Sequence, residues 1–122
     1  MKNFKQLRVW QKGLEIALAS YELVQAFPKE ERYGLYSQIT RAAVSIPSNI
    51  AEGSSRSSDR DHIRFMEIAL GSLFELETQI LISRSLGYGE LEKSTQLLKN
   101  IEDGQKMLIG FISKLGQGTK PS

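Results

Sequence analysis

His62 is the only histidine of the chain, and Asp59 and Asp61 are its nearest carboxylates along the sequence. A His–carboxylate pair can serve as a general base, but the chain has no Cys nucleophile and no Ser in a strand–turn–helix elbow. Asp59-x-x-His62 approaches the spacing of di-metal carboxylate bundles, which need two Glu-x-x-His motifs and therefore two histidines. We therefore expect no catalytic residue, no metal site and no cofactor, and we expect His62 to lie on the surface near a helix start.

A polar row lies beside the apolar positions of residues 35–54. Its members recur at steps of three and four residues, and they are Gln38, Arg41, Ser45, Ser48 and Glu52, with Asn49 next to them. A shorter row follows later in the chain, where Glu75 accompanies Ser72 and Thr78, and Glu77 interrupts an apolar stripe.

Two interpretations of these polar rows stay open. In the structural one, Ser48 or Asn49 bonds carbonyls freed by Pro47, Arg41 pairs with a later carboxylate, and the satisfied network fixes the register between two helices. In the functional one, the rows line a ligand pocket at a helix kink near Pro47. We prefer the structural interpretation.

Basic residues are concentrated in two places. The first 29 residues carry a net charge of +3, and three of their cations are Lys5, Arg8 and Lys12. Arg56, Arg60 and Arg64 recur every four residues, so they would share one ridge if the helix began early enough. Such cations can contact phosphates, and these six residues are the candidate nucleic-acid contacts; a solvated helix surface is the alternative.

Composition limits the class of protein. The 122 residues suffice for one compact domain, and the charged total of 16 Lys plus Arg against 14 Asp plus Glu gives only +2. The chain has no Cys, which excludes disulfides and thiolate metal sites. Neither a membrane span nor a signal peptide is expected, because no apolar run is long enough. We therefore expect a cytoplasmic protein.

Four segments with helical periodicity position these side chains, and breaks near Pro28, at 53–58 and at 87–89 separate them. The expected core stripes are Leu7, Trp10, Leu14, Ala17, Tyr21 and Val24; Leu35, Ile39, Ala42, Ile46 and Ile50; Met66, Leu70, Leu73, Glu77 and Ile80; and Leu97, Ile101, Gly104, Leu108, Phe111 and Leu115. Short connections favour an all-α, antiparallel up-down four-helix bundle over residues 1–116, with a flexible tail at 117–122.

The helix boundaries carry signals of their own. Ser58 is expected to cap the third helix, which should run over about 59–86, and Gly87 suits the left-handed position that ends it. Pro47 predicts a kink over residues 44–48. Phe65, Ile68, Leu76 and Ile82 lie outside the main stripe of the third segment, and this surplus predicts a second partner for that helix.

Several strings of the sequence resemble the four-helix-bundle proteins encoded in 23S rRNA intervening sequences (S23-like). The most specific is Ser-Ile-Pro-Ser-Asn-Ile-Ala-Glu-Gly at 45–53. Others are Phe-Lys-Gln-Leu at 4–7 leading to Val-Trp at 9–10, Phe-Pro-Lys-Glu-Glu at 27–31, Gln-Ile-Thr-Arg-Ala-Ala at 38–43, Ala-Leu-Gly-Ser-Leu at 69–73, Glu-Leu-Glu-Thr-Gln at 75–79 and Leu-Gly-Tyr at 86–88. The resemblance covers about 4–88, whereas the fourth segment matches only as an amphipathic helix.

The resemblance implies a bundle that assembles into a homopentameric ring and has no known catalytic residues. A related branch, the accessory variability determinant of diversity-generating retroelements, binds nucleic acid through a basic surface beside a reverse transcriptase. Our first hypothesis is a non-enzymatic oligomer that contacts RNA or a nucleoprotein. A protein–protein scaffold without nucleic-acid binding is the second hypothesis, and a small metalloenzyme is the third.

Overall fold

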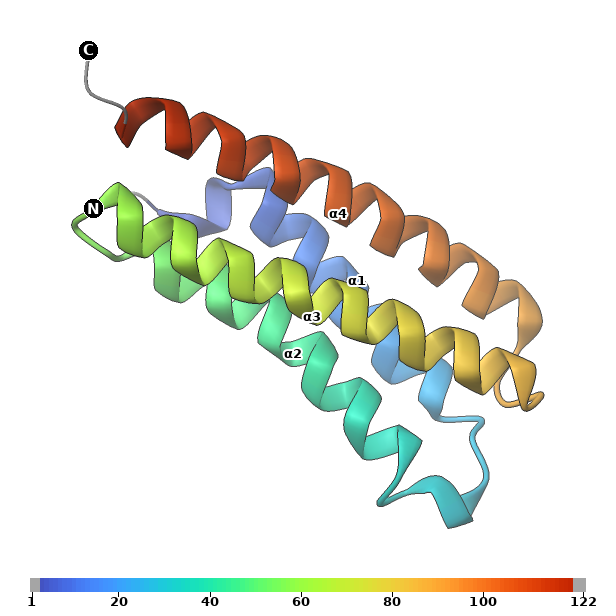
Figure 1. The fold of residues 1–122 in the computed structure, drawn as a ribbon. Coiled ribbons are helices and arrows are strands. Elements are labelled where there is room, and N and C mark those ends of the chain that lie inside the picture. Colours follow the sequence, from blue (N-terminus) through green and yellow to red (C-terminus); the bar gives the residue numbers. More distant parts are fainter. Residues whose placement is uncertain (1–2, 120–122) are drawn as a thin grey trace.

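The computed structural model describes residues 3–119, which form one antiparallel bundle of four α-helices (Figure 1). The helices are α1 (Arg8–Val24), α2 (Leu35–Ser54), α3 (Asp59–Ser85) and α4 (Leu91–Thr119). Two short 3-10 helices, η1 (Phe4–Gln6) and η2 (Lys29–Glu31), precede α1 and α2. Residues 3–119 contain no strand, so the all-α prediction is confirmed. No helix in this range is long and apolar enough to cross a membrane.

Each helix packs against two neighbours around a common apolar core. α1 and α3 lie diagonally opposite, and both contact α2 and α4. The stripes expected for the second, third and fourth segments do face this core. Ile39, Ile46, Ile50, Met66, Leu73, Ile80, Leu97, Ile101 and Leu108 are each at most 1% exposed. Burial of these side chains supplies most of the driving force for the four helices to associate.

The stripe predicted for α1 is wrong in part. Leu14 and Tyr21 are 38% and 42% exposed, and Val9, Ile16 and Leu23 are buried instead. Gly13 and Ser20 also face the core, among the buried residues of the helix. A Cβ at Gly13 would lie 3.2 Å from Ile46 Cγ2 and 3.4 Å from the Pro47 nitrogen. The small residues mark where α1 approaches α2, and a pattern of large apolar residues misses them.

The boundaries of α3 follow the sequence signals. The Ser58 side chain accepts a hydrogen bond from the Asp61 N–H at 3.1 Å, which caps the helix as expected. At the other end Gly87 has φ +78°, with its N–H bonded to Arg84 O at 3.0 Å and the Tyr88 N–H bonded to Ser83 O at 2.9 Å. These two bonds form a Schellman motif, for which glycine is preferred because no Cβ opposes a positive φ.

Two other boundaries differ from the prediction. Gly53 lies inside α2 rather than in the break, and it is buried where α2 meets α3. α4 continues to Thr119, beyond the expected domain boundary at 116, while residues 120–122 of the expected tail lie outside the described residues. Pro47 is buried within α2, which runs as one helix through the segment where a kink was expected.

Candidate nucleic-acid interface

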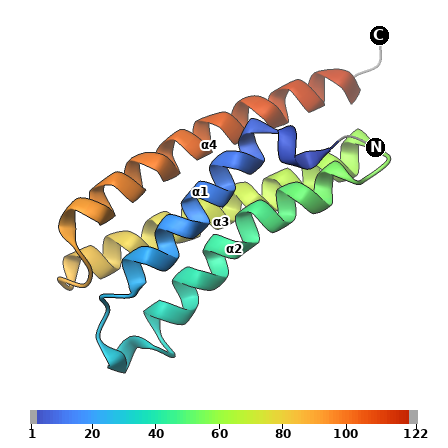
Figure 2. The ribbon, with the colours of Figure 1, turned by 180° about the vertical axis from the view of Figure 1, so that it is seen from behind.

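One end of the bundle gathers three segments that are far apart in the sequence. The start of α1, the α2–α3 connection and the end of α4 lie together there, near the labels N and C, and both views agree (Figures 1 and 2). We call this the basic end and define it as residues 3–12, 49–64 and 107–117. The first range has three cations and no carboxylate, the second has three of each, and the third contributes Lys114 alone. The basic end therefore carries a net positive charge.

The six predicted contact residues differ in how strongly other groups hold them. Lys5, Arg8, Arg60 and Arg64 form no ion pair with any described residue, and all four are exposed. Lys12 Nζ lies 3.5 Å from Glu15 Oε2, and Arg56 Nη2 lies 2.8 Å from Glu52 Oε1. Four of the six are thus available to neutralise phosphates without breaking an existing ion pair.

Arg56, Arg60 and Arg64 do not form the single helical ridge. Because Ser58 caps α3, the helix begins at Asp59 and Arg56 lies in the preceding connection. Arg56 and Arg64 instead share the Phe65 ring, with their guanidinium carbons 4.8 and 5.8 Å from its centroid. This arrangement is a cation–π cluster, in which both guanidinium groups retain most of their N–H donors.

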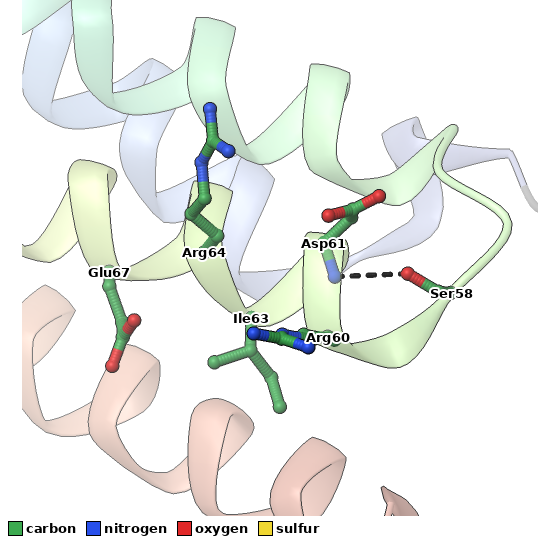
Figure 3. A pocket seen from close by; sticks show the side chains of 6 residues that line it. All are labelled: Ser58, Arg60, Asp61, Ile63, Arg64 and Glu67. Carbon is green, nitrogen blue, oxygen red and sulfur yellow. Dashed lines mark hydrogen bonds between the residues drawn. The ribbon is translucent and has the colours of Figure 1, made fainter.

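The first turns of α3 line a surface hollow of about 790 Å³ (Figure 3). Arg60 and Arg64 line it and point in different directions, and the carboxylates Asp61 and Glu67 line it as well. Two cations and two carboxylates make this hollow mixed in charge. The excess of positive charge therefore comes from the α1 and α4 side of the basic end.

Lys114 is a cation of the basic end that sequence reasoning missed. It is exposed, forms no ion pair with a described residue, and lines a groove of about 370 Å³ together with Arg8. Lys114 is far from Arg8 in the sequence, and the antiparallel order of the helices brings the end of α4 beside the start of α1. The predicted up-down topology could have identified Lys114, because it places the end of α4 and the start of α1 at the same end of the bundle.

The polar rows of α2 and α3 make some of the predicted contacts but not all. The hydroxyl groups of Ser45 and Ser72 are hydrogen-bonded between the two helices, and Asn49 Nδ2 donates to Ser45 O at 2.7 Å. Asn49 therefore bonds a carbonyl close to Pro47, whereas no described residue bonds the Ser48 side chain. Within residues 3–119 no carboxylate pairs with Arg41, so that part of the structural interpretation is wrong.

Arg41 instead faces an open groove between α2 and α3. The groove has a volume of about 240 Å³ and is also lined by Gln38, Ser45, Glu75 and Gln79. Gln79 is 7% exposed, and its Oε1 has no hydrogen-bond partner among the described residues. Both interpretations of the polar rows therefore retain a structural basis: a hydroxyl contact between helices and a small polar groove beside it.

Glu77 bonds Gln105 of α4 rather than a residue of α2. Gln105 Nε2 donates to Glu77 Oε1 at 2.9 Å, and Gln105 is 9% exposed. Glu77→Ala should lower the free energy of unfolding by about 1–3 kcal/mol, because it leaves a buried amide unsatisfied. Glu75→Ala, at an exposed site without a partner, should change it by less than about 0.5 kcal/mol. Urea denaturation measures both, and equal losses would contradict the assignment.

His62 is half-buried rather than a fully exposed surface residue. Its ring packs edge-on against Phe111 with centroids 5.5 Å apart. It also lines a hollow with Arg56, Asp59, Ser54 at the end of α2, and the loop residues Ser55 and Ser57. Among residues 3–119 no group of three or more His, Asp or Glu is placed to hold a metal ion.

At the opposite end of the bundle Lys93 is paired with carboxylates, whereas Lys29, Arg32 and Arg84 form no ion pair with a described residue. Lys93 Nζ lies 3.0 Å from Glu22 Oε1 and 3.8 Å from Glu90 Oε2. The hydrogen bond to Glu22 and the charge of Glu22 raise the pKa of Lys93. Burial and Glu31 likewise raise the pKa of Tyr88, whose hydroxyl donates to Glu31 Oε2 at 3.4 Å. This end offers a polyanion fewer unpaired cations than the basic end does.

The all-α four-helix bundle defines the fold class of this protein. The chain belongs to the family of 23S rRNA-intervening sequence proteins, whose family model matches residues 5–110. The match extends past residue 88 into α4, so the fourth helix belongs to the family pattern as well.

A solved structure supports the same assignment. The chain is similar to the crystal structure of a protein of unknown function from the S23 ribosomal protein family of Bacteroides thetaiotaomicron, with a TM-score of 0.76 and 26% identity. The similarity covers 85% of this chain and 97% of that one. No curated protein matches the chain.

Proposed function

We propose that this protein is a non-enzymatic binding protein that contacts structured RNA, alone or in a nucleoprotein, through its basic end. The observation that carries the proposal is the convergence of Lys5, Arg8, Arg60, Arg64 and Lys114, none of which pairs with a described carboxylate. Phosphate contacts from such cations release counterions and supply most of the sequence-independent affinity for nucleic acid.

A filter-binding titration tests this proposal. Structured RNA at low ionic strength should be retained by the protein in a saturable manner, and added salt should weaken the complex because counterions are released on binding. A protein that retains no RNA at low salt would contradict the nucleic-acid part of the proposal. Recovery of a protein partner after nuclease treatment would then favour the scaffold hypothesis.

Self-association is the second part of the proposal, and α3 carries the supporting observation. Ile68 and Ile82 are 43% and 46% exposed, and they lie fourteen residues apart, close to four helical turns, so they share one side of the helix. Leu76 and Phe65 were also expected outside the main stripe, but Leu76 lies in the core and Phe65 packs against it. The exposed apolar surface is therefore smaller than predicted: it consists of two isoleucines with Glu75 between them, and a second copy of the chain would cover both isoleucines.

Replacing Ile68 and Ile82 by Lys should dissociate the oligomer, because two charges would enter a desolvated contact. Light scattering should give a multiple of the chain mass for the native protein, a pentamer by family resemblance, and the mass of one chain for the variant. Ile109→Lys combined with Leu91→Lys, at positions on α4 that are 52% and 62% exposed, is the matched control and should leave the mass unchanged. A native protein that is monomeric at micromolar concentration would contradict self-association.

A further inference from the structure

The groove between α1 and α4 at the basic end combines cations with an apolar floor. Arg8 and Lys114 line it together with Val9, Met107, Gly110 and Phe111. Val9 is buried, while Met107 and Phe111 are half-buried and so retain surface that a ligand can cover. Its volume of about 370 Å³ falls within the range of about 300–1,000 Å³ that is usual for ligand sites.

The charge of this groove separates it from the other hollows of the molecule. Its lining has two cations and no carboxylate. By contrast, the hollow of Figure 3 includes Asp61 and Glu67, the hollow beside His62 includes Asp59, and the α2–α3 groove includes Glu75. Neither Arg8 nor Lys114 forms an ion pair with a described residue. An anionic ligand thus meets attraction and no local repulsion here.

We infer that this groove takes an unpaired nucleotide of the bound RNA. Arg8 and Lys114 contact the flanking phosphates, while the base lies on Val9, Met107 and Phe111. Cations that follow the backbone beside an aromatic side chain that contacts bases are the usual combination in proteins that bind single strands. A paired base cannot reach such a floor, because both of its faces are stacked inside the duplex. The inference rests on the proposed function and adds which form of RNA the basic end prefers.

Gly110 provides a variant that fills the groove without disturbing the core. A Cβ at Gly110 would meet no heavy atom within 4 Å, so Gly110→Leu places a side chain into open space beside the floor. The matched control is Gln96→Leu near the other end of α4, at an exposed position that lines no part of this groove. Both variants place a good helix former at an exposed position of α4, so both should fold.

The experiment measures fluorescence anisotropy with two probes, a single-stranded oligoadenylate and a fully paired RNA duplex. The native protein should prefer the oligoadenylate. Gly110→Leu should weaken oligoadenylate binding about tenfold, since the stacking of one base is lost, and should leave duplex binding within about twofold. Gln96→Leu should behave as the native protein does. If Gly110→Leu does not fold, the double variant Arg8→Gln with Lys114→Gln replaces it, and the single strand should lose more affinity than the duplex.

Three outcomes would overturn the inference. The native protein could bind both probes equally, or Gly110→Leu could leave the oligoadenylate affinity unchanged. Either result would contradict the binding of an unpaired nucleotide in the groove and would leave the proposed function standing. If the native protein bound neither probe, both the inference and the proposed RNA-binding function would be contradicted. An acidic peptide that binds in a Gly110-dependent manner, with no oligoadenylate bound, would assign the groove to a protein partner.

Discussion

Gly53→Ala is expected to destabilise the protein by about 1–3 kcal/mol, although alanine is the better helix former. A Cβ at this position would lie 2.7 Å from both Phe65 Cβ and Met66 Cε. The Met66 methyl group can rotate away, but Phe65 Cβ is fixed to the backbone of α3, so the two helices must separate at the basic end. Thermal denaturation followed by circular dichroism should show a melting temperature lowered by roughly 4 °C per kcal/mol.

Gly71→Ala is the matched control for this prediction. Gly71 is exposed in α3, and a Cβ there meets nothing within 4 Å, so the same exchange should raise stability by up to about 1 kcal/mol. The two substitutions should therefore have opposite signs. If both raised the melting temperature, α2 and α3 would not be in close contact at Gly53.

The second large effect concerns RNA affinity. Replacing Lys5, Arg8, Arg60 and Lys114 together by Gln should abolish measurable binding of structured RNA at physiological salt, because four unpaired cations of the basic end are removed. If each cation neutralises one phosphate, the slope of the logarithm of the binding constant against the logarithm of the salt concentration should become about 3 units less negative. The protein should fold normally, since all four side chains are exposed.

The control for this variant has the same change in net charge. Lys29, Arg32, Arg84 and Lys99 are exposed, unpaired among the described residues, and located away from the basic end. Replacing these four by Gln should weaken RNA binding only modestly, through the lower total charge. Equal losses in the two quadruple variants would show that net charge, rather than its position, governs the interaction.

The sequence predicted the helices well because their signals are local. The capping hydroxyl of Ser58, the left-handed Gly87 and the stripes of α2, α3 and α4 depend on residues within a few positions of one another. The core face of α1 was missed because close packing against α2 selects the small residues Gly13 and Ser20, which hydrophobicity patterns ignore. Gly53 was predicted to lie in the break after the second helix for the same reason. It lies inside α2, where the close approach of the distant Phe65 favours a residue without a side chain.

The candidate site was harder to predict, because it depends on topology. Clusters at 5–12 and 56–64 were visible as charge patterns, whereas Lys114 became part of the site only through the antiparallel placement of α4. Arg56 was expected on one helical ridge with Arg60 and Arg64, but α3 begins only at Asp59. The turn between α2 and α3 instead places Arg56 beside Phe65 and Glu52. Charge along a chain therefore indicates which cations exist, and the fold decides which of them lie together.

The most direct test of an RNA-binding basic end is the salt dependence of RNA affinity for the native protein. A titration series from low to physiological salt should give a linear loss, with a slope of about −3 or steeper on logarithmic axes, as expected for several neutralised phosphates. The quadruple variant of the basic end should lose most of that slope. RNA binding that does not change with salt, or that is absent at the lowest salt, would contradict the account.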